Sequence, residues 1–338
     1  MPTPISVILP VRNAAATVGE AVRSLGVAGL DDVEIIAIDD GSTDETPAVL
    51  DALRREIAAL RVLRQPHGGI AAALEAGRTA ARGAYIARMD ADDIALPYRL
   101  ARQRRFLDRH PGIGVVSGRV RFGGSRRTAK GYAAYVDWIN TLHDPADFAA
   151  QRFVESPLAH PAVMFRAECA QRHGGYRDGM FPEDYELWLR WMEAGVQFAS
   201  IPEEVLIWHD PPQRLSRTHP RYTIDAFYAM KAEYLARWCA LHVRDWPRVI
   251  VWGAGRTTRK RVQHLQSCGA RVRLWVDIDE KKIGHTVDGA PVVGPEDLPP
   301  PGQGFIIPFV GSRSARAQIR TWLEGNGYVL ERDFIPAA

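Results

Sequence analysis

The stretch YIARMDADDIALPYRL, residues 85–100, sets three carboxylates, Asp90, Asp92 and Asp93, directly after a short apolar run. Acids this close together repel one another unless a cation lies between them. Mg2+ and Mn2+ bind oxygen ligands, commonly one or two protein carboxylates together with phosphate oxygens and water. We therefore interpret Asp90 and Asp92 as residues that reach such a cation while it holds a diphosphate. A solvated acidic turn is the alternative.

Short apolar runs alternate with helical patterns through the first part of the chain. The runs that we interpret as buried strands lie at residues 5–9, 34–38, 60–65 and 84–89. Such alternation predicts an α/β fold with a mainly parallel sheet and helices on both faces. Ligands of these sheets lie beyond the carboxyl ends of the strands. Polar residues follow three such ends, at Arg12–Asn13, Asp39–Asp40 and Asp90–Asp92, which favours a common binding site.

A second domain is expected near the carboxyl terminus. An amphipathic helical pattern at residues 222–243 is followed by RDWP and then by a strand, glycine turn, helix and strand at residues 248–279. We place the boundary at residues 243–247, which gives domains of residues 1–243 and 247–338. The second, of about 90 residues, is long enough for a smaller Rossmann-like α/β domain.

The composition is that of an ordinary globular protein. The 338 residues are 46% apolar and 25% charged, and the net charge of +3 argues against bulk nucleic-acid binding. Three widely spaced cysteines predict reduced thiols in a cytoplasmic protein rather than a disulfide framework. We expect no signal peptide, because the first residues include no basic region. We expect no membrane span, because no apolar run approaches about 20 residues.

Five blocks of the sequence follow one another in a specific order, PVRNAAATVGEAVRSL, EIIAIDDGSTDET, GGIAAALEAGRTAARGAYIARMDADD, HPAVMFR and FPEDYELWLR. Together they resemble family-2 glycosyltransferases of the GT-A fold, over about residues 4–236. The resemblance implies an inverting, metal-dependent enzyme of hexosyltransferase type, with Mn2+ or Mg2+ as cofactor. Its donor would be a nucleotide-diphosphate sugar, most commonly a UDP-sugar, used in polysaccharide or glycoconjugate synthesis. The acceptor is left open among saccharides, lipid-linked sugars and proteins.

The resemblance also implies which residues hold the donor. Val11 to Asn13 line the base pocket, and Asp39 accepts a hydrogen bond from the base imide, a task that suits a carboxylate. Asp40 has a weaker claim. The full donor-binding set is Pro10, Val11, Arg12, Asn13, Asp39, Asp40, Gly69, Asp90, Ala91 and Arg214.

The family's D-x-D motif corresponds to Asp90 and Asp92. By the resemblance, Asp92 binds the metal, and Asp90 contacts the ribose or reaches the metal through water. Asp93 is then expected to cap the next turn. His209 is a further candidate metal ligand, since a neutral imidazole could complete the metal shell. The closest family pattern reads Trp-Arg-Asp at this point, so this chain departs from it.

The block FPEDYELWLR places Glu183 and Asp184 at the start of a helix. Inverting transfer needs a base that takes the proton of the acceptor hydroxyl. The resemblance assigns that role to Asp184 and leaves Glu183 to orient the acceptor or a neighbouring group. The alternative is that both acids only complement the positive end of the helix. His160, in SPLAHPAVMFR, is interpreted evenly as a residue that lines the site or as a structural one.

Arginines gather in two further segments. Arg214 and Arg217 suit closure over a diphosphate because of their forked geometry, with a solvated loop as the alternative. A solvated helix face is predicted for Arg99, Arg102, Arg104, Arg105 and Arg109. Basic faces also attract anionic surfaces, so the expected location is cytoplasmic, with peripheral contact at the inner face of a membrane left open.

The second domain opens with Gly253 and Gly255 after a strand, and Asp277 follows 22 residues later. These are parts of a dinucleotide-binding pattern whose third glycine is replaced by Thr258. An NAD(P)-dependent oxidoreductase is therefore one alternative function, and a non-catalytic nucleotide-sugar-binding protein is another. The segment also resembles the Rossmann-like domains that precede some sugar acyltransferases. A non-catalytic module is favoured, and ligand binding or homo-oligomer formation through this domain stays open.

Overall fold

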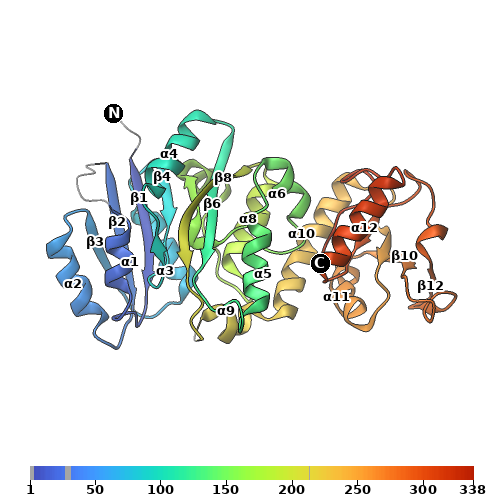
Figure 1. The fold of residues 1–338 in the computed structure, drawn as a ribbon, viewed down its shortest axis with the longest axis horizontal. Helices are drawn as coiled ribbons and strands as arrows, with labels where there is room; N and C mark the ends of the chain where they lie inside the picture. Colours follow the sequence, from blue (N-terminus) through green and yellow to red (C-terminus); the bar gives the residue numbers. More distant parts are fainter. Residues whose placement is uncertain (1–3, 27–31, 213) are drawn as a thin grey trace. The chain divides into compact units, whose positions relative to one another are not determined.

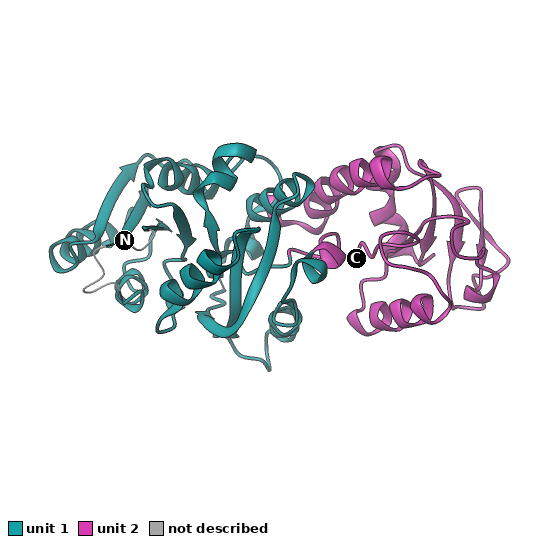
Figure 2. Ribbon diagram, turned by 90° about the horizontal axis from the view of Figure 1, so that it is seen from above, with its two compact units in different colours: residues 1–148, 157–219 teal, residues 149–156, 220–338 magenta. Residues whose placement is uncertain are grey.

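The computed structural model describes residues 4–26, 32–212 and 214–338 (Figure 1). The chain divides into two compact units: unit 1 comprises residues 1–148 and 157–219, and unit 2 comprises residues 149–156 and 220–338 (Figure 2). Helix α10 (Ile224–His242) belongs to unit 2, where it packs against α11 (Arg256–Ser267). The domain boundary expected at residues 243–247 lies after α10 and stays a prediction.

Unit 1 is built on a sheet with the strand order β3-β2-β1-β4-β7-β6-β8-β5. Its strands are β1 (Ile5–Val11), β2 (Val33–Asp40), β3 (Leu60–Gln65), β4 (Tyr85–Arg88), β5 (Ile94–Ala95), β6 (Ile113–Phe122), β7 (Met164–Arg166) and β8 (Gln197–Trp208). Strands β3, β2, β1 and β4 are parallel, whereas β7 runs antiparallel to both of its neighbours. The carboxyl ends of β1, β2 and β4 therefore share one edge, and the expected α/β fold class is confirmed.

Helices cover both faces of this sheet. Those that contribute to the core on one face are α1 (Val18–Ser24), α2 (Thr46–Glu56), α4 (Arg99–Arg109) and α5 (Lys130–Ile139). Those on the opposite face are α3 (Ile70–Ala80), α7 (Ala167–His173) and α8 (Glu183–Glu193). Alternation along β1 serves both cores, since Val7 and Leu9 join the first and Ile8 joins the second. None of the helices within the described ranges has the length and apolar character that a membrane span requires.

Two strands of unit 1 run further than their apolar patterns indicate. β1 continues to Val11 and β2 to Asp40, so that Val11 pairs opposite Asp39 in register. By contrast, β3 spans the expected residues 60–65, and Pro47 lies in the first turn of α2, where a proline fits. Asp39 and Asp40 thus lie inside the sheet, which fixes the direction of their side chains, whereas Arg12 and Asn13 follow the end of β1.

Unit 2 holds a second, smaller sheet with the strand order β11-β12-β10-β9-β13. Its strands are β9 (Arg248–Trp252), β10 (Arg271–Val276), β11 (Thr286–Val287), β12 (Ala290–Val293) and β13 (Ile306–Pro308). All are parallel to their neighbours except β11, which is antiparallel to β12. Helix α12 (Arg313–Gly325) contributes Leu323 to a core with Ile250 and Val276. The strand, glycine turn, helix and strand expected from residue 248 onward are therefore present.

Arg99 corrects the expectation of a solvated helix face. It is 2% exposed, its Nη2 donates to the carbonyl oxygen of Arg88 at 2.7 Å, and its Nε donates to Gln103 Oε1 at 3.2 Å. Burial lowers the pKa of Arg99 to about 9, against the opposing effect of Asp93. Because α4 begins over the end of β4, its first arginine binds that strand end instead of pointing to water. The expectation holds for the exposed residues Arg102, Arg105 and Arg109.

Replacing Arg99 by alanine should lower the free energy of unfolding by about 2 to 3 kcal/mol, because buried carbonyl oxygens lose a charged donor. Arg105→Ala, an exposed position on the same helix, should change it by less than about 0.5 kcal/mol. Urea unfolding followed by tryptophan fluorescence measures both variants. Equal effects at the two positions would contradict the role of Arg99 in holding β4.

Candidate active site

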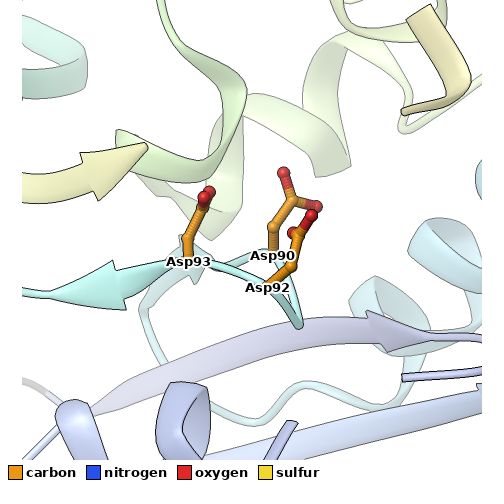
Figure 3. Close-up of side chains that lie close together, drawn as sticks. All are labelled: Asp90, Asp92 and Asp93. Carbon is orange, nitrogen blue, oxygen red and sulfur yellow. The ribbon is translucent and has the colours of Figure 1, made fainter. Parts of the chain in front are cut away.

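The turn after β4 gathers three carboxylates. One oxygen from each of Asp90, Asp92 and Asp93 lies within 4.8 Å of the others. Figure 3 shows the carboxyl groups of Asp90 and Asp92 side by side, with that of Asp93 set apart from them. Burial and then the charge of Asp90 raise the pKa of Asp92 to about 6. Carboxylates that repel one another in a partly desolvated turn fit a hard divalent cation, so the residues present suit Mg2+ or Mn2+.

Asp93 does not cap the following turn, contrary to expectation. It is 1% exposed, and its Oδ1 accepts a hydrogen bond of 2.8 Å from the backbone N–H of His209, just after β8. Its Oδ2 is buried and has no hydrogen-bond partner among the residues that the structure describes. Burial and then the charges of Asp90 and Asp92 raise the pKa of Asp93 well above its ordinary value. Asp93 therefore links the acidic turn to the end of β8 through a hydrogen bond.

His209 lies beside the acids in a defined tautomer. Its Nδ1 is 2.7 Å from the backbone carbonyl oxygen of Asp92, which can only accept, so Nδ1 carries the proton. In the neutral ring Nε2 then keeps a lone pair, as it does in imidazoles that bind a metal. His209 is not part of the group whose ligand atoms all lie within 4.8 Å of one another, so its role as a metal ligand stays a prediction.

Arg88 is a buried cation directly beneath the acidic turn. It ends β4, is 4% exposed and forms an ion pair with Asp90. Burial alone would lower the pKa of Arg88, but the charge of Asp90 opposes that effect, and the pKa is raised. The charge of Arg88 also acts on Asp92 and on Asp184. One buried guanidinium thus influences both the acidic turn and the start of α8.

Asp40 is saturated by hydrogen bonds from its own unit. Its Oδ1 accepts from Gln65 Nε2 at 2.7 Å and from the N–H of Gly68 at 2.8 Å. Its Oδ2 lies 2.8 Å from His67 Nδ1 and accepts from the N–H of Gly69 at 2.9 Å, where Gly69 takes a left-handed φ of 86° that favours glycine. Burial alone would raise the pKa of Asp40, but these hydrogen bonds lower it. Its carboxylate positions the loop that leads into α3.

Asp39, the other acid at the end of β2, keeps accepting capacity. It is 3% exposed, and within the described ranges its side chain has one hydrogen bond, to Oδ1 from the N–H of Ser42 at 3.0 Å. A carboxylate has about four accepting positions, so others stay available for a ligand. Of the two acids that end β2, Asp39 is therefore the one that can receive a donor group from a bound base.

The loop after β1 is tied to the loop after β2. The N–H of Asn13 donates to Ser42 Oγ at 3.0 Å, and Asn13 Oδ1 accepts from the N–H of Thr43 at 2.8 Å. Asn13 takes a left-handed φ of 50°, which asparagine tolerates better than most residues. Before it, Val11 is buried and Arg12 is exposed. These bonds bring the expected base-binding residues to the same sheet edge as Asp39.

The first turn of α8 carries Glu183 and Asp184. Glu183 is 3% exposed, and Asp184 is half-buried. Burial and then the charge of Glu183 raise the pKa of Asp184 to about 7, although Arg88 opposes the shift. If the acids only complemented the positive helix end, the pKa of Asp184 would fall rather than rise. A carboxylate that takes up a proton near neutral pH is suited to act as a general base.

His160 belongs to the core beneath this turn. It is 6% exposed, its Nε2 lies 2.9 Å from the hydroxyl of Tyr176, and its ring meets Trp188 edge-on with centroids 5.8 Å apart. Burial and then the charge of Arg88 lower the pKa of His160 well below its ordinary value, so the ring is neutral. These contacts favour the structural interpretation of His160.

Arg214 lies over an aromatic ring close to the acids. Its guanidinium carbon is 4.1 Å from the ring centroid of Trp208, and its Nη1 is 3.4 Å from the carbonyl oxygen of His209. Its charge acts to lower the pKa of Asp92 and of Asp93, against the upward shift that burial causes. Arg217, by contrast, forms an ion pair with Asp210. Arg214 is therefore the better placed of the two to meet an anion bound at the acidic turn.

Known proteins are similar to this chain in sequence and in fold. A family model described as Glycosyl transferase family 2 matches residues 6–174, half of the chain. This chain belongs to glycosyltransferase family 2. The enzyme is 29% identical, over 188 residues, to the amylovoran biosynthesis glycosyltransferase AmsE of Erwinia amylovora, covering 55% of this chain and 68% of AmsE. It is 28% identical, over 227 residues, to EpsE of Bacillus subtilis, covering 65% of this chain and 78% of EpsE.

A solved structure supports the same assignment at the level of the fold. This family-2 glycosyltransferase is similar to residues 1–349 of S. aureus TarS in complex with UDP-GlcNAc, with a TM-score of 0.55. The identity is 14%, and the match covers 78% of this chain and 71% of that chain. The GT-A fold implied by the resemblance is confirmed.

Two charged residues of the enzyme were not identified as site residues from the sequence. The sequence signal for Arg88 is that it is the single cation in an otherwise apolar strand. A cation that is buried in this way requires a carboxylate partner. The role of Asp93 depends on a contact with His209, 116 residues away, so no local pattern carries it. The acids Asp90 and Asp92, in contrast, lie together as expected.

Asp40→Asn should destabilise the enzyme by about 1 to 3 kcal/mol at neutral pH, because an amide N–H would face N–H donors. Ionised Asp40, whose pKa is lowered, contributes stability that is present above the unfolded pKa of about 3.9 and is lost as the pH falls through the folded value. The difference in unfolding free energy between wild type and variant should therefore shrink in acid. Denaturant unfolding at several pH values measures it, with exposed Glu45→Gln as control. A difference that is constant with pH would contradict the role of the ionised carboxylate.

Proposed function

We propose that this family-2 glycosyltransferase transfers a sugar, with inversion, from a UDP-sugar to an acceptor hydroxyl in polysaccharide or glycoconjugate synthesis. The observation that carries the proposal is the pairing of Asp90 with Asp92 beside Arg88, whose charge also acts on Asp184. One buried charge network then serves a donor site and a base. The name of AmsE supports the polymer setting, and the UDP-GlcNAc in the TarS structure supports the donor class.

Donor recognition begins at the ends of β1 and β2. Asp39 accepts a hydrogen bond from the uracil N–H, which its free accepting positions allow. Arg12 and Asn13 line the base pocket from the adjoining loop. Asp40 holds that pocket in place through the Gly69 loop rather than by touching the base.

The diphosphate is held at the end of β4. Asp92 would hold a divalent cation, Mg2+ or Mn2+, while Asp90 would reach the ribose or the cation through water, and His209 would offer Nε2 as a further ligand. The chemistry supplied by a bound cation would be neutralisation of the charge on the departing diphosphate, so that no general acid would be required. Arg214, supported by the ring of Trp208, adds a second positive charge on the same side.

Asp184 takes the proton of the acceptor hydroxyl as that oxygen attacks the anomeric carbon. Its raised pKa follows from burial and from Glu183, which keeps the carboxylate basic enough to accept a proton near neutral pH. Glu183, buried in the first turn of α8, orients the acceptor or the base. The acceptor itself is a saccharide, lipid-linked or protein hydroxyl.

The oxidoreductase alternative gains no support from unit 2. Asp277, which would have to bind a ribose, accepts from the N–H of Ala254 at 2.8 Å and of Asp279 at 3.0 Å, and it pairs with Lys282 at 3.1 Å. Both of its oxygens are therefore occupied. For location, we propose the cytoplasm, because all three cysteines are free thiols.

Asp92→Asn should abolish Mn2+-dependent binding of UDP, because it removes the charged ligand. Asp184→Asn should leave the affinity for UDP within about threefold, since it lies outside the donor site. Titration calorimetry with UDP, with and without MnCl2, measures both variants. UDP binding by Asp92→Asn with undiminished dependence on Mn2+ would rule out this metal site.

The enzyme should hydrolyse a UDP-sugar, with water in place of the acceptor, and the rate can be followed as released UDP. This rate should increase as the pH rises through about 7 and then level off, because Asp184 must be ionised to act as the base. In Asp184→Asn the rate should fall by at least about a hundredfold and lose this pH dependence. Exposed Glu193→Gln, at the other end of α8, is the matched control. A wild-type pH profile that survives in Asp184→Asn would assign the base to another residue.

A further inference from the structure

Unit 2 contains a group of cations with a single acid among them. We define it as the arginine cluster: Glu155, Tyr228, Lys231, Arg261, Arg313 and Arg316. The cations come from three helices, with Lys231 on α10, Arg261 on α11, and Arg313 and Arg316 on α12. The acid, Glu155, belongs to the segment at residues 149–156. Elements distant in sequence thus bring positive charge to one place.

The contacts within the arginine cluster are mostly with neutral groups. Lys231 Nζ donates to the carbonyl oxygen of Ala337 at 2.7 Å and lies 3.9 Å from the ring centroid of Tyr228. Arg261 lies over the same ring at 4.7 Å, and Arg316 Nη1 donates to the carbonyl oxygen of Gly311 at 3.2 Å. These contacts hold the cations in position but do not neutralise them.

One weak ion pair is the only charge compensation found there among the described residues. Arg313 Nη2 lies 3.4 Å from Glu155 Oε2. The Nε atoms of Arg261 and Arg313 are buried without a hydrogen-bond partner in the part of the chain that the structure describes. Burial lowers the pKa of Lys231 well below its ordinary value, yet three guanidinium groups still meet one carboxylate. The guanidinium groups of Arg261, Arg313 and Arg316 are half-buried, and partly desolvated cations with so little counter-charge favour the binding of an anion.

The position of the cluster in the fold points to a ligand as well. Arg313 begins α12, which follows the carboxyl end of β13, and β13 lies beside β9. From β9 the sheet grows toward β10 on one side and β13 on the other, which makes this a topological switch point, where open parallel sheets bind ligands. The N-terminus of α12 adds its own positive partial charge. A Cβ on Gly311 would lie 2.8 Å from Arg261 Nη1, so glycine allows this loop to approach the guanidinium.

We propose that the arginine cluster of unit 2 is a second anion-binding site, which takes a phosphate or diphosphate group. Three guanidinium groups against one carboxylate leave an excess of two positive charges, which matches a phosphate dianion better than a single carboxylate. Arginine forks also bind phosphate oxygens in pairs. The site is independent of the donor site of unit 1, because no residue is shared.

Titration of the full-length enzyme with inorganic pyrophosphate tests the site. The titration is made in EDTA, because the proposed donor site needs a divalent cation. Wild type should bind pyrophosphate, and Arg261→Gln/Arg316→Gln should bind it at least about tenfold more weakly. Arg320→Gln is the matched control, since Arg320 lies on α12 in an exposed pair with Glu324 and should leave the affinity unchanged. Equal loss in the control and the double variant would overturn the site.

Glu155→Gln keeps the test decisive if the double variant fails to fold. Removing the only carboxylate should strengthen pyrophosphate binding, whereas a merely structural salt bridge would give weaker or unchanged binding and so contradict the proposal. A second arm separates soluble from lipid-held phosphate by sedimentation with phosphatidic acid vesicles, against phosphatidylcholine vesicles. Binding to pyrophosphate alone assigns a soluble ligand, and binding to phosphatidic acid vesicles alone assigns a lipid headgroup. Binding to neither overturns the proposal.

Discussion

The buried charge of Arg88 is the constraint on which the unit 1 site depends. A guanidinium that is 4% exposed is stable only if opposite charges surround it, and the acidic turn provides them through Asp90. The dependence is mutual, because Asp90, Asp92 and Asp93 could not crowd one turn without a nearby cation. Arg99 extends the network by binding the carbonyl oxygen of Arg88, and the repulsion between the two arginines contributes to its lowered pKa. Charge balance at the end of β4 is thus built into the fold rather than left to a surface loop.

Neighbouring acids in unit 1 have different roles, and the direction of their side chains along the backbone explains the difference. Asp39 and Asp40 are adjacent on β2, where successive side chains point to opposite faces. The carboxylate of Asp40 accepts hydrogen bonds from the backbone of Gly68 and Gly69, whereas Asp39 still has positions that can accept a hydrogen bond from a ligand. The acidic turn repeats the division, since Asp93 is bound to β8 while Asp92 lies beside Asp90. A pair of acids at a strand end therefore provides one residue that positions the site and one that can meet a ligand.

The sequence predicts the parts of this protein that depend on local pattern. Alternating apolar runs predict the parallel sheet, and adjacency along one turn brings Asp90 and Asp92 together. What it does not predict depends on where distant segments meet. Residue type alone predicts Arg99 at the surface, because nothing local shows that α4 starts over β4. Local pattern predicts a cap for Asp93, because its partner comes after a strand more than a hundred residues later. Likewise, the hydrogen bonds that occupy the carboxylate of Asp40 depend on where Gly69 lies in the fold, and a sequence pattern does not predict that position.

The ligands proposed for the two units are of opposite sign at the same topological position, and the element that follows each strand accounts for the difference. In unit 1, β4 leads through its acidic turn into β5 rather than into a helix, so no helix N-terminus adds positive charge where carboxylates gather for a cation. In unit 2, β9 and β13 lead directly into α11 and α12, whose N-termini favour anions, and arginines are added to them. The acid that could oppose this at the glycine turn is already engaged, since Asp277 is bound to that turn and to Lys282. The end of β4, which is followed by another strand, therefore suits a cation, whereas the ends of β9 and β13, which are followed by helices, suit an anion.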